Sequence, residues 1–183
     1  MRLFAAIGLP PAQQAELTRA LAGLDLAALR PVPSEQRHLT LAFYGEVPAD
    51  VVPELTERLE RAGRRTPPLR LRLSHLGAFP KPAAARVLWA GVDGDVAGLR
   101  RLAERCAAAG TRSGIAMEAR AYRPHVTAGR ARKEPLDLRE VVAAPLDGAP
   151  WEAATFALVQ SVLGPRPVHT ALVTFALGGG QRE

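Results

Sequence analysis

Cysteine is almost missing from this chain, since Cys106 is the only one among 183 residues. A single cysteine excludes an intramolecular disulfide, and such usage is typical of a protein from a reducing compartment. We therefore predict a cytoplasmic protein. Cys106 follows Leu99 and Leu102 at helical spacing, which favours a buried packing residue over a nucleophile.

Long apolar runs are absent as well. No run approaches the roughly 18 residues that a membrane-crossing helix needs. The apolar opening at residues 3–7 is broken by Gly8 and Pro10 before the core of a signal peptide can form. A hydrophobic fraction of 48% is ordinary for a globular protein. We expect one globular unit over residues 1–183 and no membrane partner.

Lysine is scarce, because Lys81 and Lys133 are the only lysines among 24 basic residues. Against 18 acidic residues this leaves a formal charge of +6 and an isoelectric point near 10.6. The planar arginine fork suits bidentate contacts with phosphate. The charge therefore indicates a polyanionic partner such as nucleic acid, although a biased genome composition would give the same count.

One short pattern occurs twice, as a His-x-Thr triplet at residues 38–40 and again at 125–127. Both triplets lie among strand-forming residues, and alternate side chains of a strand share a face. Each histidine should therefore lie beside its own threonine, with Leu39, Leu41 and Phe43 on the core face of the first strand. Two imidazoles can divide acid–base work, because one accepts a proton while the other donates one.

The arginines near the two triplets have different expected roles. Arg130 follows His125 by five positions, and we expect a loop to turn it back to complete an anion pocket. Arg37 and Arg123 precede the two histidines and are further candidates for this pocket. The alternative for Arg37 is a solvated charge at a strand edge, because a regular strand points it away from His38. The sequence does not assign a role to Arg37 or Arg123.

Other cofactor chemistry finds little support. His75 and His169 lack the His-x-Thr pattern, so we expect neither to be catalytic. Zinc and iron sites usually combine histidine with nearby cysteine or carboxylate ligands, which both triplets lack. The chain has no phosphate-binding Gly-x-x-x-x-Gly-Lys loop. We therefore predict metal-independent chemistry without a cofactor.

Strands and helices alternate unevenly along the chain. The main strands expected, besides those of the triplets, cover residues 3–7, 69–73, 85–92, 154–163 and 168–177. Helices fall between them, a turn is expected at 164–167, and the tail from Gly178 is expected to be mobile. Because each half holds helices and one His-x-Thr strand, the simplest architecture is an α+β pair of lobes related by a pseudo-twofold axis.

Several segments resemble the two-histidine phosphoesterase superfamily, and within it the RNA 2′,3′-cyclic phosphodiesterases, also described as 2′-5′ RNA ligases. The resemblance rests on both triplets and extends over nearly the whole chain. The segments that carry it are 2–7, 38–47, 86–92 and 122–127. It implies a bilobed fold in which two antiparallel sheets flank a cleft, with helices on the outside.

The resemblance also implies an activity, hydrolysis of a terminal 2′,3′-cyclic phosphate of RNA to a 2′-phosphate. His38 matches the proton donor and His125 the proton acceptor, while Thr40, Thr127 and Arg130 are expected to bind the substrate. The same groups would join RNA through a 2′-5′ linkage when a 5′-hydroxyl replaces water. The expected partner is RNA with a cyclic phosphate end, such as a tRNA fragment, and the expected state is a monomer.

Two other functions stay open at this level. One is a cyclic phosphodiesterase for a small nucleotide, such as an ADP-ribose cyclic phosphate or a 2′-5′ oligonucleotide. The other is an RNA-binding protein without catalysis, which would show salt-dependent binding but no turnover. Paired histidines favour an enzyme, because a protein that only binds has no need of them.

Overall fold

The computed structural model describes residues 1–164 and 167–178. Part of the expected turn at 164–167 and most of the expected tail lie outside the described residues. The strands are β1 (Arg2–Gly8), β2 (Leu29–Pro31), β3 (His38–Glu46), β4 (Leu69–Phe79), β5 (Val87–Gly94), β6 (His125–Ala131), β7 (Trp151–Ala153), β8 (Thr155–Val162) and β9 (Val168–Ala176). The helices are α1 (Pro11–Ala22), α2 (Val52–Arg64), α3 (Val96–Arg112) and α4 (Arg139–Val142), with short 3-10 turns at Ser34–Gln36 and Pro82–Ala84.

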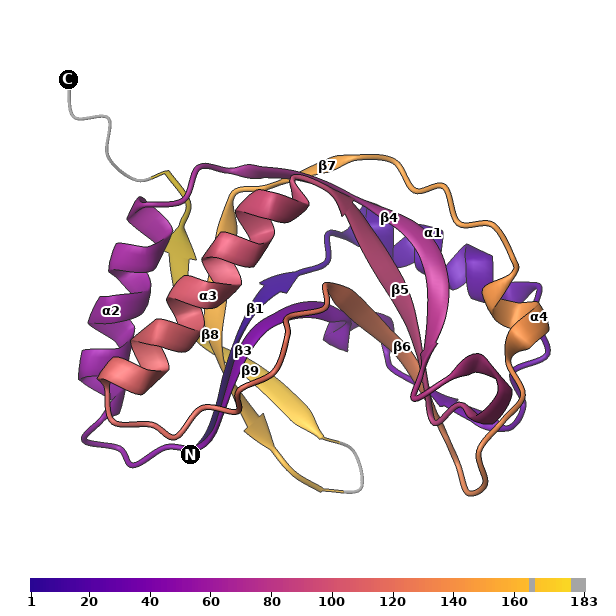
Figure 1. Cartoon of the computed structure of the whole chain (residues 1–183), viewed down its shortest axis with the longest axis horizontal. Coiled ribbons are helices and arrows are strands. Elements are labelled where there is room, and N and C mark those ends of the chain that lie inside the picture. The colour runs from indigo at the N-terminus through magenta and orange to yellow at the C-terminus, as the bar shows by residue number, and fades with distance from the viewer. Residues whose placement is uncertain (165–166, 179–183) are drawn as a thin grey trace.

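The described strands form one curled antiparallel sheet in the order β7-β4-β5-β6-β3-β1-β8-β9, and β2 also pairs with β6 (Figure 1). Strand pairing is shortest at the centre of the sheet, where β3 and β6 meet through a single residue pair, Leu39 with Val126. This seam separates two halves, β3-β1-β8-β9 and β7-β4-β5-β6. Each half begins at the seam with one of the two His-x-Thr strands.

The two halves repeat one another in topology. Along the chain, helix α1 and then β2 lie between the neighbouring strands β1 and β3, and helix α3 lies between the neighbouring strands β5 and β6. Helices α2 and α3 lie side by side against the first half, while α1 and α4 lie on the second (Figure 1). The predicted α+β fold with two antiparallel halves is confirmed, and the structure adds that the halves are continuous across the seam.

Strand β3 shows how the apolar pattern builds the core and where it breaks. Leu39 and Leu41 are buried, and His38 and Thr40 are half-buried on the opposite face. Phe43, expected in the core, is 41% exposed, and the Arg2 guanidinium lies over its ring at 4.6 Å. The expectation was wrong because the β1–β3 pairing shifts register within β3, and such bulges exchange the two faces of a strand.

Helix α3 anchors the first half. Leu99, Leu102 and Cys106 are fully buried along one side of it, which confirms Cys106 as a packing residue. Burial raises the pKa of the Cys106 thiol, and its backbone carbonyl accepts a hydrogen bond of 3.0 Å from the Tyr44 hydroxyl. Within the described residues, the helices are too short or too polar to span a bilayer.

Candidate active site at the seam of the sheet

The seam brings the two His-x-Thr triplets together. Pairing of Leu39 with Val126 places His38 across from Thr127 and Thr40 across from His125 in the antiparallel ladder. Leu39 and Val126 are buried on one face, so the two histidines and two threonines lie on the other, which we call the histidine face. Each half of the sheet therefore supplies one imidazole and one hydroxyl to a shared site.

Both imidazoles are held by the same device. Nδ1 of His38 lies 2.7 Å from the carbonyl oxygen of Gln36, and Nδ1 of His125 lies 2.7 Å from that of Arg123. Because a carbonyl oxygen only accepts hydrogen bonds, each Nδ1 carries a proton and donates it. Each histidine is the first residue of its strand, so the carbonyl two positions earlier is available outside the ladder. Nε2 of each ring is thereby left for a reactant, as an acceptor when neutral and a donor when charged.

The surroundings make both histidines hard to protonate in the free protein. Burial lowers the pKa of His38 from an ordinary value near 6.5 to about 4, against the hydrogen bond to the Gln36 carbonyl that raises it. The positive charges of His169, His125 and Arg130 lower the pKa of His38 further. Burial also lowers the pKa of His125, and the charges of Arg120 and Arg130 lower it further. A site this poor in negative charge favours an anion between the imidazoles.

Arg130 reaches the histidine face through a bulge. Between β5 and β6 the register shifts, so that Trp89 pairs with Thr127 but Leu88 pairs with Gly129 and Val87 with Arg130. The extra residue in β6 moves Arg130 onto the face that carries Thr127. Sequence reasoning placed Arg130 at the site but expected a loop to turn it there, whereas the turning occurs within the strand.

Aromatic rings flank each imidazole. On the first half, the Phe4 ring stacks on His38 at 4.8 Å between centroids, and the His169 ring meets His38 edge-on at 5.3 Å. On the second half, Phe79 lies 5.0 Å and Trp89 6.0 Å from the His125 ring. These rings fix the orientation of the imidazoles and limit their contact with water.

His169 is the site residue that sequence reasoning set aside. It lies on β9, where it pairs with Ser161 of β8, and both belong to the same half of the sheet as His38. Its ring contacts both Phe4 and His38. Its sequence context, His169-Thr170, gave no signal, because the contact depends on which strands are neighbours in the sheet. His75, by comparison, contacts Trp89 and is one ring removed from His125.

A glycine lies across from each histidine of the pair. Gly8 of β1 pairs with His38, and Gly91 of β5 pairs with His125. A Cβ atom on Gly91 would lie 2.1 Å from the His75 ring, so a side chain at this position would displace that ring. The absence of a side chain at Gly91 therefore leaves room for the His75 ring, which packs against Trp89.

The two arginines without an assigned role have structural tasks. Arg37 is only 7% exposed, which excludes the alternative of a solvated charge at a strand edge. Its guanidinium donates to the Gln14 carbonyl at 3.1 Å and the Thr18 hydroxyl at 2.7 Å, which ties α1 to the start of β3. Arg123 is exposed and contributes its backbone carbonyl, the acceptor for His125.

The Tyr122 hydroxyl links the two triplets across the seam. It donates a hydrogen bond of 3.0 Å to the carbonyl of Thr40, so a residue three positions before His125 holds the strand of the first triplet. Burial raises the pKa of Tyr122, and the hydroxyl stays a donor. Tyr122 lies outside β6, which begins only at His125.

Other places for a ligand lie apart from the histidine face. Among the residues that the structure describes, no three histidine, cysteine or acidic side chains are grouped to hold a metal ion. A cavity of about 580 Å³ lies between α2 and α3, and one of about 240 Å³ lies beneath α1. Neither is lined by a histidine. The histidine face is therefore the candidate active site.

Comparison with known proteins identifies the family of the chain. A sequence model of the LigT-like phosphoesterases matches residues 7–89. An RNA 2′,3′-cyclic phosphodiesterase of Thermus thermophilus is 37% identical over 98% of this chain and 91% of its own length. The RNA 2′,3′-cyclic phosphodiesterase of Escherichia coli K12 is 35% identical over 96% of both chains.

Solved structures give the same result. A crystal structure of a Thermus thermophilus protein superimposes with a TM-score of 0.85 at 34% identity, covering 98% of this chain and 99% of the other. The crystal structure of Escherichia coli LigT complexed with 3′-AMP superimposes with a TM-score of 0.82 at 31% identity, covering 96% and 97%. The resemblance noted in the sequence is confirmed, and the chain belongs to the family of LigT-like phosphoesterases.

Proposed function

We propose that this protein hydrolyses the terminal 2′,3′-cyclic phosphate of RNA to a 2′-phosphate. The observation that carries the proposal is the matched pair of imidazoles, each fixed through Nδ1 to its own backbone and contributed by opposite halves of the sheet. The names of the Thermus and Escherichia relatives support the substrate class. The formal charge of +6 suits a polyanion.

The reaction needs a base and an acid on opposite sides of the phosphorus atom. Neutral His125 accepts a proton at Nε2 from water as its oxygen attacks phosphorus. The bond between phosphorus and O3′ breaks, and His38, protonated at Nε2, gives its proton to O3′. The products are a 2′-phosphate and a 3′-hydroxyl, and the two histidines exchange protons with solvent to restore the starting state.

The remaining site residues stabilise charge on the phosphate. The hydroxyls of Thr40 and Thr127 donate to its nonbridging oxygens, and Arg130 offsets the negative charge that grows in the transition state. A 5′-hydroxyl of RNA in place of water leads to a 2′-5′ linkage through the same steps. Ligation and hydrolysis then differ only in the nucleophile.

The pKa values of the free site predict how the rate depends on pH. Because the pKa of both histidines is lowered, the two limbs of the kcat/KM profile lie at or below about pH 6.5. The bound phosphate anion raises the pKa of both imidazoles, since an opposite charge favours the protonated form. The kcat profile is therefore bell-shaped and displaced to higher pH than the kcat/KM profile.

We infer further properties from the same residues. Residues 1–183 act as one two-lobed domain, because each lobe supplies half of the site. The partner is RNA with a 2′,3′-cyclic phosphate end, such as a tRNA fragment, and the protein acts as a monomer. Its single, buried cysteine favours the cytoplasm.

One assay tests the activity. RNA ending in a 2′,3′-cyclic phosphate is incubated with the protein in excess EDTA, and the phosphate position in the product is identified by mass spectrometry after selective phosphatase treatment. We expect a 2′-phosphate. A 3′-phosphate contradicts the choice of leaving oxygen, and loss of activity in EDTA contradicts metal-independent chemistry. If the protein turns over only an ADP-ribose cyclic phosphate or a 2′-5′ oligonucleotide, that small nucleotide is the substrate and RNA is not. If it binds RNA without turnover, it is an RNA-binding protein and not an enzyme.

Variants test the two roles separately. Replacing His38 or His125 by Ala should lower kcat/KM by about 10²–10⁴-fold, whereas the matched control His75→Ala should have little effect. A cyclic substrate with sulfur in place of O3′ expels a thiolate, which needs no proton from an acid. It should restore turnover to His38→Ala but not to His125→Ala. Restoration of His125→Ala alone would reverse the two assignments.

A further inference from the structure

The groove between α2 and α3 has an unusual composition. Its cavity of about 580 Å³ is lined by six arginines, three alanines and a single acidic residue, Glu104. We call it the arginine groove, and its arginines are Arg58, Arg61, Arg65, Arg101, Arg105 and Arg112. The groove lies on the helices and not on the histidine face.

Helical periodicity explains how the arginines collect there. On α2 and its C-cap residue Arg65 they recur at intervals of three and four residues, and on α3 at four and seven, so each set occupies one stripe of its helix. The Arg105 guanidinium donates to the Thr66 hydroxyl at 2.7 Å, which joins the two helices at the end of α2. From Arg101 to Arg112, α3 rises by about 16 Å, so the row of charge extends along most of the helix.

Much of this charge has no partner in the protein. Arg58 and Arg61 pair with glutamates one turn earlier on α2, but exposed pairs of this kind contribute little to the stability of the fold. Among the described residues, Arg65, Arg101 and Arg112 form no ion pair. The arginines without an ion pair repel one another and bind polyanions favourably.

Basic charge continues from the groove towards the site. Helix α3 ends at Arg112, and residues 113–124 then lead directly to His125, as Figure 1 shows between α3 and β6. Arg120 lies on this segment, where it pairs with Glu118 at 3.6 Å, and its charge lowers the pKa of His125. Arg112, Arg120 and Arg130 therefore mark a basic path from the groove to the imidazole that activates water.

We propose that the arginine groove binds the phosphodiester backbone of the RNA whose cyclic end lies at the histidine face. This inference rests on the proposed function and deepens it by assigning a second contact to the substrate. A nucleic acid strand carries one phosphate per roughly 3.4 Å when stacked, so a row of about 16 Å faces several phosphates. An acidic protein fits less well, because the lining offers only alanine as apolar surface and protein interfaces need larger anchors.

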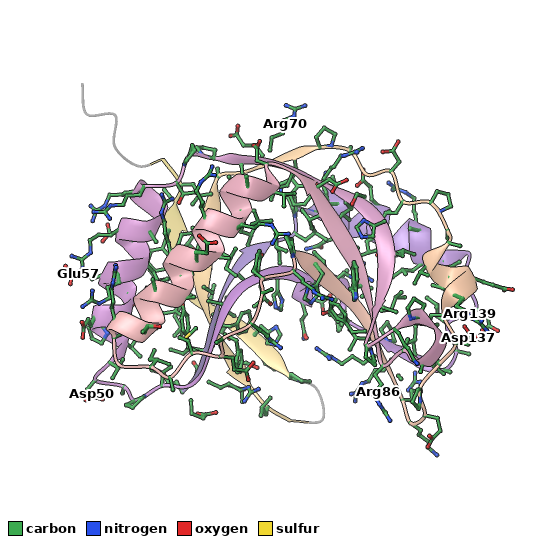
Figure 2. The ribbon with its side chains drawn as sticks, in the orientation of Figure 1. Asp50, Glu57, Arg70, Arg86, Asp137 and Arg139 are labelled. Carbon is green, nitrogen blue, oxygen red and sulfur yellow. The ribbon has the colours of Figure 1, made fainter. Side chains whose placement is uncertain are left out.

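Two double variants provide the test. The groove variant is Arg101→Gln with Arg112→Gln, both exposed and without an ion pair in the described part of the chain. The control is Arg19→Gln with Arg139→Gln, exposed residues on α1 and α4, of which Arg139 pairs with Asp137. Figure 2 shows Arg139 at the opposite end of the molecule from Glu57 of α2. Both variants remove the same formal charge.

Three probes separate the groove from the catalytic site. Binding is measured by fluorescence anisotropy with a labelled RNA of about 20 nucleotides that ends in a 3′-hydroxyl, over a series of salt concentrations. Turnover is measured with the same RNA ending in a 2′,3′-cyclic phosphate and with adenosine 2′,3′-cyclic phosphate. The mononucleotide is too short to extend from the histidine face to the groove.

The groove variant should bind the long RNA about 10-fold more weakly, and the slope of log K against log salt should decrease by about 1.4. Its KM for the long cyclic RNA should rise, while its kcat/KM for the mononucleotide stays at the wild-type value, which also shows an intact fold. The control variant should match the wild type throughout.

Equal RNA binding by the groove variant and the wild type overturns the inference, and so does an equal loss in both double variants. Polyglutamate that competes with RNA at equal charge concentration overturns the choice of RNA. Should the wild type turn over neither cyclic substrate while the groove variant alone loses RNA binding, the proposed activity fails and the groove stands.

Discussion

Protonation of His38 should make the fold sensitive to mild acid. Burial lowers the pKa of His38 in the folded protein to about 4, whereas an unfolded chain leaves it near 6.5. A proton therefore binds the unfolded chain more tightly than the folded one. The stability linked to this histidine is fully present above about pH 6.5 and is lost as pH falls towards 4.

The size of the effect follows from the two pKa values. Between about pH 7.5 and pH 4.5, His38 alone lowers the free energy of unfolding by about 2.5 kcal/mol. The lowered pKa of His125 and of His169 adds loss in the same direction. Comparison with a variant of one histidine is therefore needed to isolate the contribution of His38.

Urea unfolding followed by tryptophan fluorescence measures the contribution of His38 to the free energy of unfolding. His38→Gln keeps a polar side chain of similar length but does not titrate in this range, so its free energy of unfolding should fall with acid by about 2.5 kcal/mol less than that of the wild type. His75→Gln is the matched control, since His75 is exposed, and it should follow the wild-type curve. If His38→Gln and the wild type lose equal stability between the two pH values, the inferred burial of the imidazole is incorrect.

The other predictions concern neighbours of the two imidazoles. His169→Ala removes a positive charge and a packed ring beside His38, so the pKa of His38, followed by NMR titration of its ring proton, should rise; an unchanged value would contradict the contact. Thr127→Ala should lower kcat/KM by about 10- to 100-fold through loss of one hydrogen bond to the charged phosphate, and a change under 2-fold, within about 0.4 kcal/mol, would exclude that bond. Arg130→Gln should lower kcat/KM by about 10²–10³-fold and move the kcat/KM limbs to higher pH, because its charge lowers the pKa of both histidines. Tyr122→Phe should cost about 1 kcal/mol of stability in thermal unfolding through loss of its hydrogen bond to Thr40, and an unchanged melting temperature would show that water replaces it.

Much of the site was visible in the sequence because its signals are local. Alternation along a strand placed each histidine beside its threonine, and helical spacing buried Cys106. Errors arose where the pairing of strands alters the alternation. Phe43 left the core because β3 shifts register against β1, and Arg130 entered the site through a bulge in β6. A register shift depends on both paired strands. The residue pattern of one segment therefore does not reveal it.

The sequence by itself determined which chemical groups this protein has to work with: two imidazoles, two hydroxyls and a large excess of arginine. Short-range periodicity is enough for that, because neighbouring residues decide which side of a strand or helix a group occupies. Only the tertiary structure decided that one pair, Leu39 with Val126, joins the halves and brings the imidazoles together. It also placed His169 against His38 and gathered the arginines of α2 and α3 in one groove. These positions depend on how whole helices and strands pack against one another, and that packing is fixed by contacts between segments distant in the sequence.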